Sequence, residues 1–225
     1  MQQENNSKSP YLLIVVGILA VSTAAILIKS ALPFASPIAV AFHRLFFSAI
    51  IAILIFSFTK TKEKLHFDPR LIGTLSLSGL LLALHFALWI WSLDLVSVNS
   101  SVIFVTTSPL WVGFLSPLVL KEKVPNRFYV GVLFAFMGGL LIAILGNNNG
   151  GSNTLPGLLM ALLSAWMVAG YLLVGRKVAK RMSTELYVSI VYSIAAVVLG
   201  FFLLIIEKGL PTYPPRIYLI FLLLA

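Results

Sequence analysis

Long apolar runs alternate with short polar segments along this chain of 225 residues. A helix that crosses the hydrocarbon core of a bilayer needs about 20 apolar residues. Seven runs come close to that length, namely 11–28, 37–58, 71–93, 100–120, 128–146, 156–175 and 186–206. Because the runs are continuous and rich in leucine, they favour helices over the alternating strands that build a membrane barrel. The pattern predicts an all-α polytopic membrane protein.

A shorter apolar run occupies residues 216–225, where the sequence ends. About ten helical residues rise only about 15 Å, which is half of a hydrocarbon core about 30 Å thick. We therefore expect the sequence to end inside an eighth membrane helix. In this interpretation the chain is truncated within helix 8.

The composition agrees with this class of protein. Apolar residues make up 60% of the chain and charged residues 10%, whereas a globular protein carries about 25% charged residues. The sequence contains no cysteine, which excludes disulfides, thiolate zinc sites and cysteine nucleophiles.

The basic residues lie unevenly between the spans. If successive spans cross in alternate directions, 12 of the 16 lysines and arginines fall on the side of the N-terminus and three on the other, with Arg44 inside the second span. The positive-inside rule then places the N-terminus in the cytoplasm. Short basic loops beside spans suit anionic lipid headgroups. The net charge of +9 therefore indicates no nucleic-acid partner.

A linker rich in asparagine and glycine, residues 147–155, follows the fifth span and divides the chain. At an offset of 147 positions, Lys29 matches Arg176 and Ser36 matches Ser183. Five spans are an odd number, so a second copy would enter the membrane from the opposite side. Many secondary transporters are inverted repeats of this kind. We expect one repeat at 1–146 and an incomplete second one at 156–225.

Several short motifs resemble the EamA-type family of the drug/metabolite transporter superfamily. Their order and spacing along the first 146 residues are similar to that family's pattern. The motifs are Pro37 with Arg44 seven residues later, Ser92-Leu93-Asp94 before Asn99-Ser100-Ser101, Ser108-Pro109-Leu110-Trp111, Lys121-Glu122-Lys123, and Gly131 with Gly138-Gly139. The resemblance implies a bundle of five plus five helices in inverted repeat.

The resemblance also implies a function. We expect a secondary transporter, an exporter of small metabolites such as amino acids, nucleobases or drugs, that works by alternating access without ATP or a cofactor. Its partners would be the lipid bilayer and a small-molecule substrate, with proton coupling and a homo-oligomer left as open alternatives. We expect it in the bacterial plasma membrane.

Arg44 is a charge inside a span, about seven residues from the outer end of the second helix. A charge at that depth costs several kcal/mol unless it is paired or reaches the interface. Arg44 could contact the substrate or gate its path. Alternatively, its long side chain could extend to the outer interface or brace the helix.

His85 lies on a polar face of the third predicted helix. Ser78, His85, Trp89 and Ser92 recur at offsets that share one side of a helix. Polar side chains are unfavourable in contact with lipid, so we expect this face to point into the bundle. Histidine suits proton coupling because its pKa is near neutral. The alternative is a neutral imidazole bonded to a neighbouring helix.

The fourth predicted helix carries a second polar face, with Ser100, Thr107 and Trp111. Pro109 cannot donate its backbone amide, and its ring clashes with the carbonyl of Val105, so it predicts a kink. Irregular backbone at membrane depth is tolerated where it meets protein, water or ligand. We expect a cavity wall here, to which Trp166 could contribute. The alternatives are a packing kink and a space-filling aromatic residue.

Other positions suggest structural roles. Glu122 could form an ion pair or a gate at the cytoplasmic end of the fourth helix, or remain a solvated loop acid. Small residues repeat every fourth position in two spans, a spacing that lets helices approach closely. These packing positions are Gly131, Ala135, Gly139 and Ala143 in the fifth span, and Ala161, Ala165 and Ala169 in the sixth.

Two other classes of protein are alternatives to a transporter. An intramembrane enzyme could use His43, His85 and serines, but the sequence has no Gly-x-Ser-x-Gly or His-Glu-x-x-His motif. Three histidines without acidic neighbours also make a poor metal site. We therefore expect no enzyme activity and no metal. A non-catalytic membrane sensor or assembly subunit is the third alternative, supported only by the small-residue positions.

Overall fold

The computed structural model describes residues 9–59, 68–145, 153–179 and 181–225, and this part of the chain is helical without strands. The order of elements is α1 (Ser9–Ala31), α2 (Pro37–Phe58), α3 (Pro69–Leu95), α4 (Val98–Val105), α5 (Ser108–Val119), α6 (Asn126–Leu145), α7 (Leu155–Val178), α8 (Thr184–Glu207) and α9 (Pro215–Leu223). Each predicted span coincides with a helix or, for the fourth span, with two. The all-α prediction is confirmed.

Polar residues just before the apolar runs set the starts of the helices. Each cap accepts a hydrogen bond from a backbone N–H three residues further on, which satisfies a donor that the first turn leaves free. The capping residues are Ser36 for α2, Asp68 for α3, Ser97 for α4, Thr154 for α7 and Ser183 for α8. Ser36 and Ser183, which correspond at the offset of 147 positions, therefore both cap the N-terminus of a helix.

The fourth predicted span is broken at Thr106 and Thr107, where α4 ends and α5 begins. Pro109 follows in the first turn of α5, where its missing N–H is least costly. The kink predicted from the proline is thus a short non-helical turn in the structure. It divides the span near its middle.

Apolar side chains cover the outside of the bundle. Five helical segments of the described part are long and apolar enough to cross a membrane, counting α4 and α5 as one. Phe58, Leu118, Phe134 and Val197 are among the most exposed large apolar residues. Such a surface is stable against lipid and not against water. The fold is that of an all-α polytopic membrane protein.

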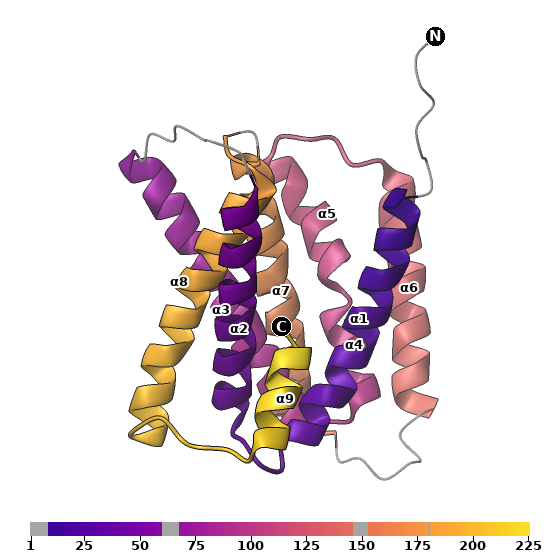
Figure 1. The fold of residues 1–225 in the computed structure, drawn as a ribbon. Coiled ribbons are helices and arrows are strands. Elements are labelled where there is room, and N and C mark those ends of the chain that lie inside the picture. Colours follow the sequence, from indigo (N-terminus) through magenta and orange to yellow (C-terminus); the bar gives the residue numbers. More distant parts are fainter. Residues whose placement is uncertain (1–8, 60–67, 146–152, 180) are drawn as a thin grey trace.

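The α3 helix packs along α7 and α8, and α2 also packs along α8 (Figure 1). Small residues permit this close packing. On α7 the alanines Ala161, Ala165 and Ala169 have no exposed surface. Gly79 of α3 sits against Ile194 of α8. The packing expected for the three alanines is therefore observed.

The corresponding positions on α6 behave differently. Gly131 and Ala135 are exposed, and no atom of the described residues lies within 4 Å of where a Cβ at Gly131 would be. The α6 helix contacts α4 and α5 through other residues, such as Phe128 against Gly113. The expected close packing at Gly131 is thus absent from this structure. The side chains of Gly139 and Ala143 lie outside the described residues.

Candidate functional site

The polar face of α3 points into the bundle. Ser78, His85, Trp89 and Ser92 are all buried, with at most 9% of any of these residues exposed. Ser78 hydrogen-bonds to the hydroxyl of Tyr187 on α8, and the Ser92 hydroxyl lies 2.6 Å from that of Ser101 on α4. The inward orientation expected for this face is confirmed. Its part in carrying a substrate stays a prediction.

His85 joins α3 to α7. Its Nδ1 lies 3.0 Å from the backbone oxygen of Ser164 and 3.3 Å from the Ser164 hydroxyl. A carbonyl oxygen can only accept, so Nδ1 carries the proton in this bond. The imidazole also stacks on Trp89, with ring centroids 6.0 Å apart at an angle of 19°. Ser164 therefore holds the histidine in one orientation next to the tryptophan.

Arg44 of α2 reaches the same region of α3. Its Cζ atom lies 4.5 Å from the centre of the Phe86 ring and 5.6 Å from that of Trp89. Such placements over aromatic faces stabilise a cation by cation–π attraction. Its Nη1 atom is buried without a hydrogen-bond partner among the described residues. Arg44 therefore packs against the aromatic rings of α3, and its contact with a substrate stays a prediction.

A second group of aromatic and hydroxyl side chains lies beside the break between α4 and α5. The indole Nε1 of Trp111 donates to the Thr107 hydroxyl at 3.2 Å, and the Thr107 hydroxyl donates to the backbone oxygen of Phe104. The rings of Trp111 and Trp166 meet edge to face with centroids 4.7 Å apart. The structure thus brings together three of the predicted residues, from α5, α7 and the turn between α4 and α5.

A small pocket of about 130 Å³ opens at this break. Its lining is mostly apolar and comes from both sides of the turn and from α6; the residues are Ile103, Thr106, Thr107, Pro109, Leu110, Val132, Ala135 and Phe136. Ala135, expected to pack against a helix, lines this pocket. The break therefore coincides with a hollow, as irregular backbone at membrane depth requires.

Ser100 has a local role. It is buried in the first turn of α4, where its N–H donates to the Ser97 hydroxyl at 3.1 Å and its own hydroxyl accepts from Ser97 at 2.9 Å. The capping geometry explains the serine at position 97, because its side-chain oxygen accepts from the backbone N–H of residue 100. A contribution of Ser100 to a substrate path stays a prediction.

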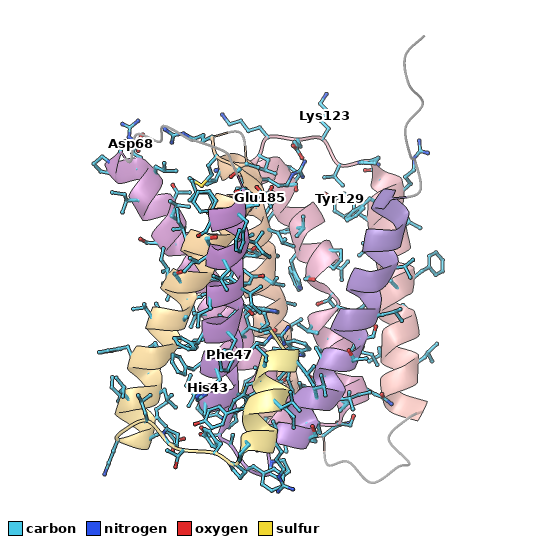
Figure 2. All side chains as sticks on the ribbon, viewed as in Figure 1. His43, Phe47, Asp68, Lys123, Tyr129 and Glu185 are labelled. Carbon is cyan, nitrogen blue, oxygen red and sulfur yellow. The ribbon has the colours of Figure 1, made fainter. Side chains whose placement is uncertain are left out.

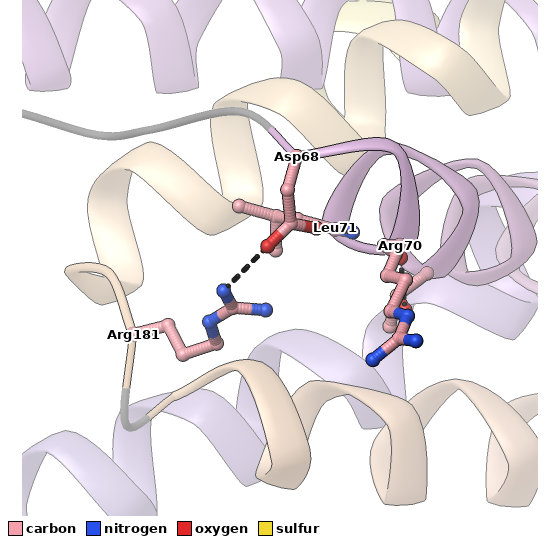
Figure 3. A network of polar contacts seen from close by, with 5 residues as sticks. Asp68, Arg70, Leu71 and Arg181 are labelled. Atoms are coloured by element: carbon pink, nitrogen blue, oxygen red, sulfur yellow. Dashed lines mark hydrogen bonds and ion pairs between the residues drawn. The ribbon is translucent and has the colours of Figure 1, made fainter.

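Two ion pairs tie the first 146 residues to the helices that follow the linker. Glu122, just after α5, pairs with Arg176 near the end of α7 through two contacts of 3.0 and 3.1 Å. Asp68, at the start of α3, pairs with Arg181 at 2.9 Å (Figure 3). Figure 2 shows Asp68, Lys123 and Glu185 toward the same end of the bundle, while His43 lies toward the other. The ion-pair alternative for Glu122 is thus the one the structure adopts.

The Glu122–Arg176 pair should contribute little to stability. About half of each side chain is exposed, at 48% and 55%, and exposed pairs contribute about 0–1 kcal/mol. Glu122→Gln is expected to lower the free energy of unfolding by no more than about 1 kcal/mol, as measured by denaturant titration in detergent. Exchange of the two charges, Glu122→Arg with Arg176→Glu, should restore the loss. A loss several times larger would contradict a solvent-exposed pair.

Asp68 should make stability depend on pH. The backbone N–H of Leu71, followed by the guanidinium of Arg181, holds the pKa of the Asp68 carboxyl below its usual range. The folded state therefore favours the carboxylate. Its contribution is present above the usual aspartate pKa of about 3.9 and is lost as the pH falls through the lowered pKa of the folded state.

Melting curves of wild type and Asp68→Asn should separate with pH. Asparagine still caps a helix, so this variant removes the charge and keeps the cap. Wild type is expected to be the more stable above about pH 5 and to lose that advantage below about pH 4. Parallel curves for the two proteins would show that Asp68 is not linked to folding.

Sequence reasoning did not identify three contributors to the site, namely Phe86, Ser164 and Arg181. Phe86 and Arg181 look like an ordinary apolar residue and an ordinary loop charge. Ser164 was identifiable in principle, because it is a single serine among the small residues of 161–169. In the described part, no group of three His, Asp or Glu side chains is placed to hold a metal ion.

The fold defines an integral membrane protein whose apolar core contains a buried polar face, on α3. Comparison with protein families identifies it further: the model of the EamA-like transporter family matches residues 8–144. This match covers more than half of the chain, so the chain belongs to that family, within the drug/metabolite transporter superfamily. It is therefore a membrane transporter by family. A comparison with curated proteins gave no match.

Proposed function

We propose that this protein is a secondary transporter that exports small metabolites, such as amino acids, nucleobases or drugs, by alternating access. The observation that carries the proposal is the buried polar face of α3, where His85 and Trp89 meet Arg44 of α2 and Ser164 of α7. Polar side chains buried at membrane depth are costly, so they are retained mainly where they serve a pathway.

The proposed organisation is an inverted repeat, with 1–146 as the first copy and 156–225 as part of the second. In this scheme α1, α2 and α3 correspond to α7, α8 and α9. Several contacts support it: α2 packs on its own counterpart α8, and the α3–α7 contact has its equivalent in α9–α1. The contacts of α3 with α8 and of α9 with α2 are a second such pair. Substrate sites of inverted-repeat transporters lie between the copies.

The path would run between α3, α5 and α7. Thr107, Trp111 and Trp166 would form one wall beside the turn before Pro109, and His85 with Trp89 the other. The Glu122–Arg176 and Asp68–Arg181 pairs would hold the cytoplasmic ends of the two copies together and open during transport. The N-terminus would lie in the cytoplasm of a bacterial cell. His85 is the residue proposed for proton coupling.

Counterflow in proteoliposomes tests the proposal. Vesicles containing the intact protein are loaded with an unlabelled amino acid, nucleobase or drug and diluted into a trace of the labelled compound. A carrier accumulates the label transiently and releases it unchanged, while empty vesicles do not. Chemical conversion of the label would favour the enzyme, and equilibration without overshoot for every compound would contradict a carrier.

A further inference from the structure

The guanidinium of Arg44, a half-buried residue, has a buried Nη1 atom and no counterion in the described part of the chain. The carboxylates of that part all lie at or near helix ends, at Asp68, Asp94, Glu122, Glu185 and Glu207. Asp68 and Glu122 already pair with other arginines. A charge taken out of water costs several kcal/mol unless a partner compensates it.

A second buried donor lies beside it. The indole Nε1 of Trp89 is buried and has no hydrogen-bond partner among the described residues. The same is true of the Nη1 atom of Arg44. The two residues are in contact, with the Arg44 Cζ atom 5.6 Å from the Trp89 ring centre. Native proteins leave few buried donors unsatisfied, and each one calls for an explanation.

We propose that these two donors bind the carboxylate of the transported molecule. This inference rests on the proposed transport function and names the class of substrate. A carboxylate supplies what both donors lack, because it accepts several hydrogen bonds and neutralises one positive charge. The substrate is therefore a small organic acid or a zwitterion that carries one carboxylate.

The surroundings favour a single negative charge. Arg44 is the only arginine or lysine within the membrane-crossing part of α2, and His85 next to it commits its Nδ1 proton to the Ser164 carbonyl. One cation balances a carboxylate and leaves a phosphate dianion with an uncompensated charge. The faces of Phe86 and Trp89 hold the guanidinium from one side, so that its remaining N–H groups are oriented before the substrate arrives.

Arg216 provides a matched control. Its Cζ atom also lies 4.5 Å from the centre of an aromatic ring, that of Phe34, but the residue is exposed at the start of α9. Arg216→Gln removes the same charge and the same kind of contact without touching the buried donors. Both variants therefore lose one positive charge, but only Arg44→Gln loses an unpaired buried donor.

Binding is tested on the intact protein in neutral detergent through the rise in melting temperature that a ligand causes. The probes are acetate, benzoate and indole-3-acetate, each paired with its neutral amide, and inorganic phosphate. At least one carboxylate is expected to stabilise wild type and Arg216→Gln, while its amide and phosphate do not. In Arg44→Gln its affinity should fall by roughly a hundredfold or more, and in Trp89→Phe by roughly tenfold.

Stability without ligand provides a separate readout. Arg44→Gln removes a charge without a counterion and its unpaired buried Nη1 donor, so the ligand-free variant should melt no lower than wild type. If glutamine prevents folding, Arg44→Lys keeps the charge without the planar fork and should bind the carboxylate at least about tenfold more weakly. The proposal is wrong if no carboxylate stabilises wild type, if an amide does so equally, or if the Arg44 variants bind as wild type does.

Counterflow with the same compounds separates the two proposals. A carrier that exchanges neutral or cationic compounds, with carboxylates neither bound nor exchanged, would leave the transport function standing and overturn the carboxylate site. Binding of a carboxylate that depends on Arg44, without counterflow of any compound, would support the site and contradict the transport function. Counterflow of a carboxylate that Arg44→Gln abolishes and Arg216→Gln preserves would support both.

Discussion

Replacing Gly79 with leucine is expected to lower the free energy of unfolding by about 1–3 kcal/mol or more, the usual range for overpacking a core. A Cβ at this position would lie 2.5 Å from the Cγ2 atom of Ile194, 2.7 Å from its Cβ and 3.2 Å from the backbone oxygen of Val191. A longer side chain cannot fit unless α3 and α8 separate. The melting temperature and the monodisperse yield in detergent should both fall.

Gly131→Leu is the matched control for this substitution. It makes the same change near the start of α6, at a position where no described atom lies within 4 Å of the added Cβ. Leucine in a lipid-facing helix should leave the melting temperature nearly unchanged. If Gly131→Leu were the damaging variant and Gly79→Leu harmless, the packing of α3 on α8 described here would be wrong.

Replacing His85 with leucine is expected to cost about 1–3 kcal/mol of stability, the range for leaving a buried polar group without its partner. The substitution removes the Nδ1–H that donates to Ser164 and the ring that stacks on Trp89. The measurement is the free energy of unfolding in detergent. Because α3 packs along α7 through this bond, substrate counterflow should decrease as well.

His85→Asn separates a structural role from proton coupling. The asparagine amide can occupy the position of Nδ1 and donate to Ser164, but it does not titrate near neutral pH. Stability should therefore recover toward that of wild type. If His85 carries the coupled proton, uptake by His85→Asn should no longer respond to an imposed pH gradient. An unchanged response would leave His85 with the structural role alone.

The helices were predictable because the physics that selects them is local. An apolar run long enough to cross the membrane must satisfy its own backbone hydrogen bonds, so its length alone specifies a helix. The break before Pro109 is equally local, since it follows from a missing N–H and a ring clash. The caps at Ser36 and Ser183 require only a hydroxyl three residues before a free amide.

Packing partners were less predictable because spacing shows which residues share a face and not what that face meets. The alanines of α7 and the small residues of α6 have the same four-residue spacing. In the structure Ala165 is fully buried while Gly131 is exposed. The same limit applied to Arg44, whose environment depends on Phe86 and Trp89 of a different helix. The partner of Glu122, Arg176, lies 54 residues away.

The central claim is that water and substrate reach a path beside Trp111 and Trp166. The sequence contains no cysteine, so single-cysteine variants report on one position each. Trp166 is 43% exposed on α7, and Phe201 is 62% exposed on the outside of α8. The direct measurement is the rate at which a membrane-impermeant thiol reagent labels Trp166→Cys and Phe201→Cys in proteoliposomes. We predict faster labelling at position 166, although position 201 is more exposed, because lipid covers position 201. An aqueous path would be contradicted if Trp166→Cys were not labelled, or if Phe201→Cys were labelled faster than Trp166→Cys.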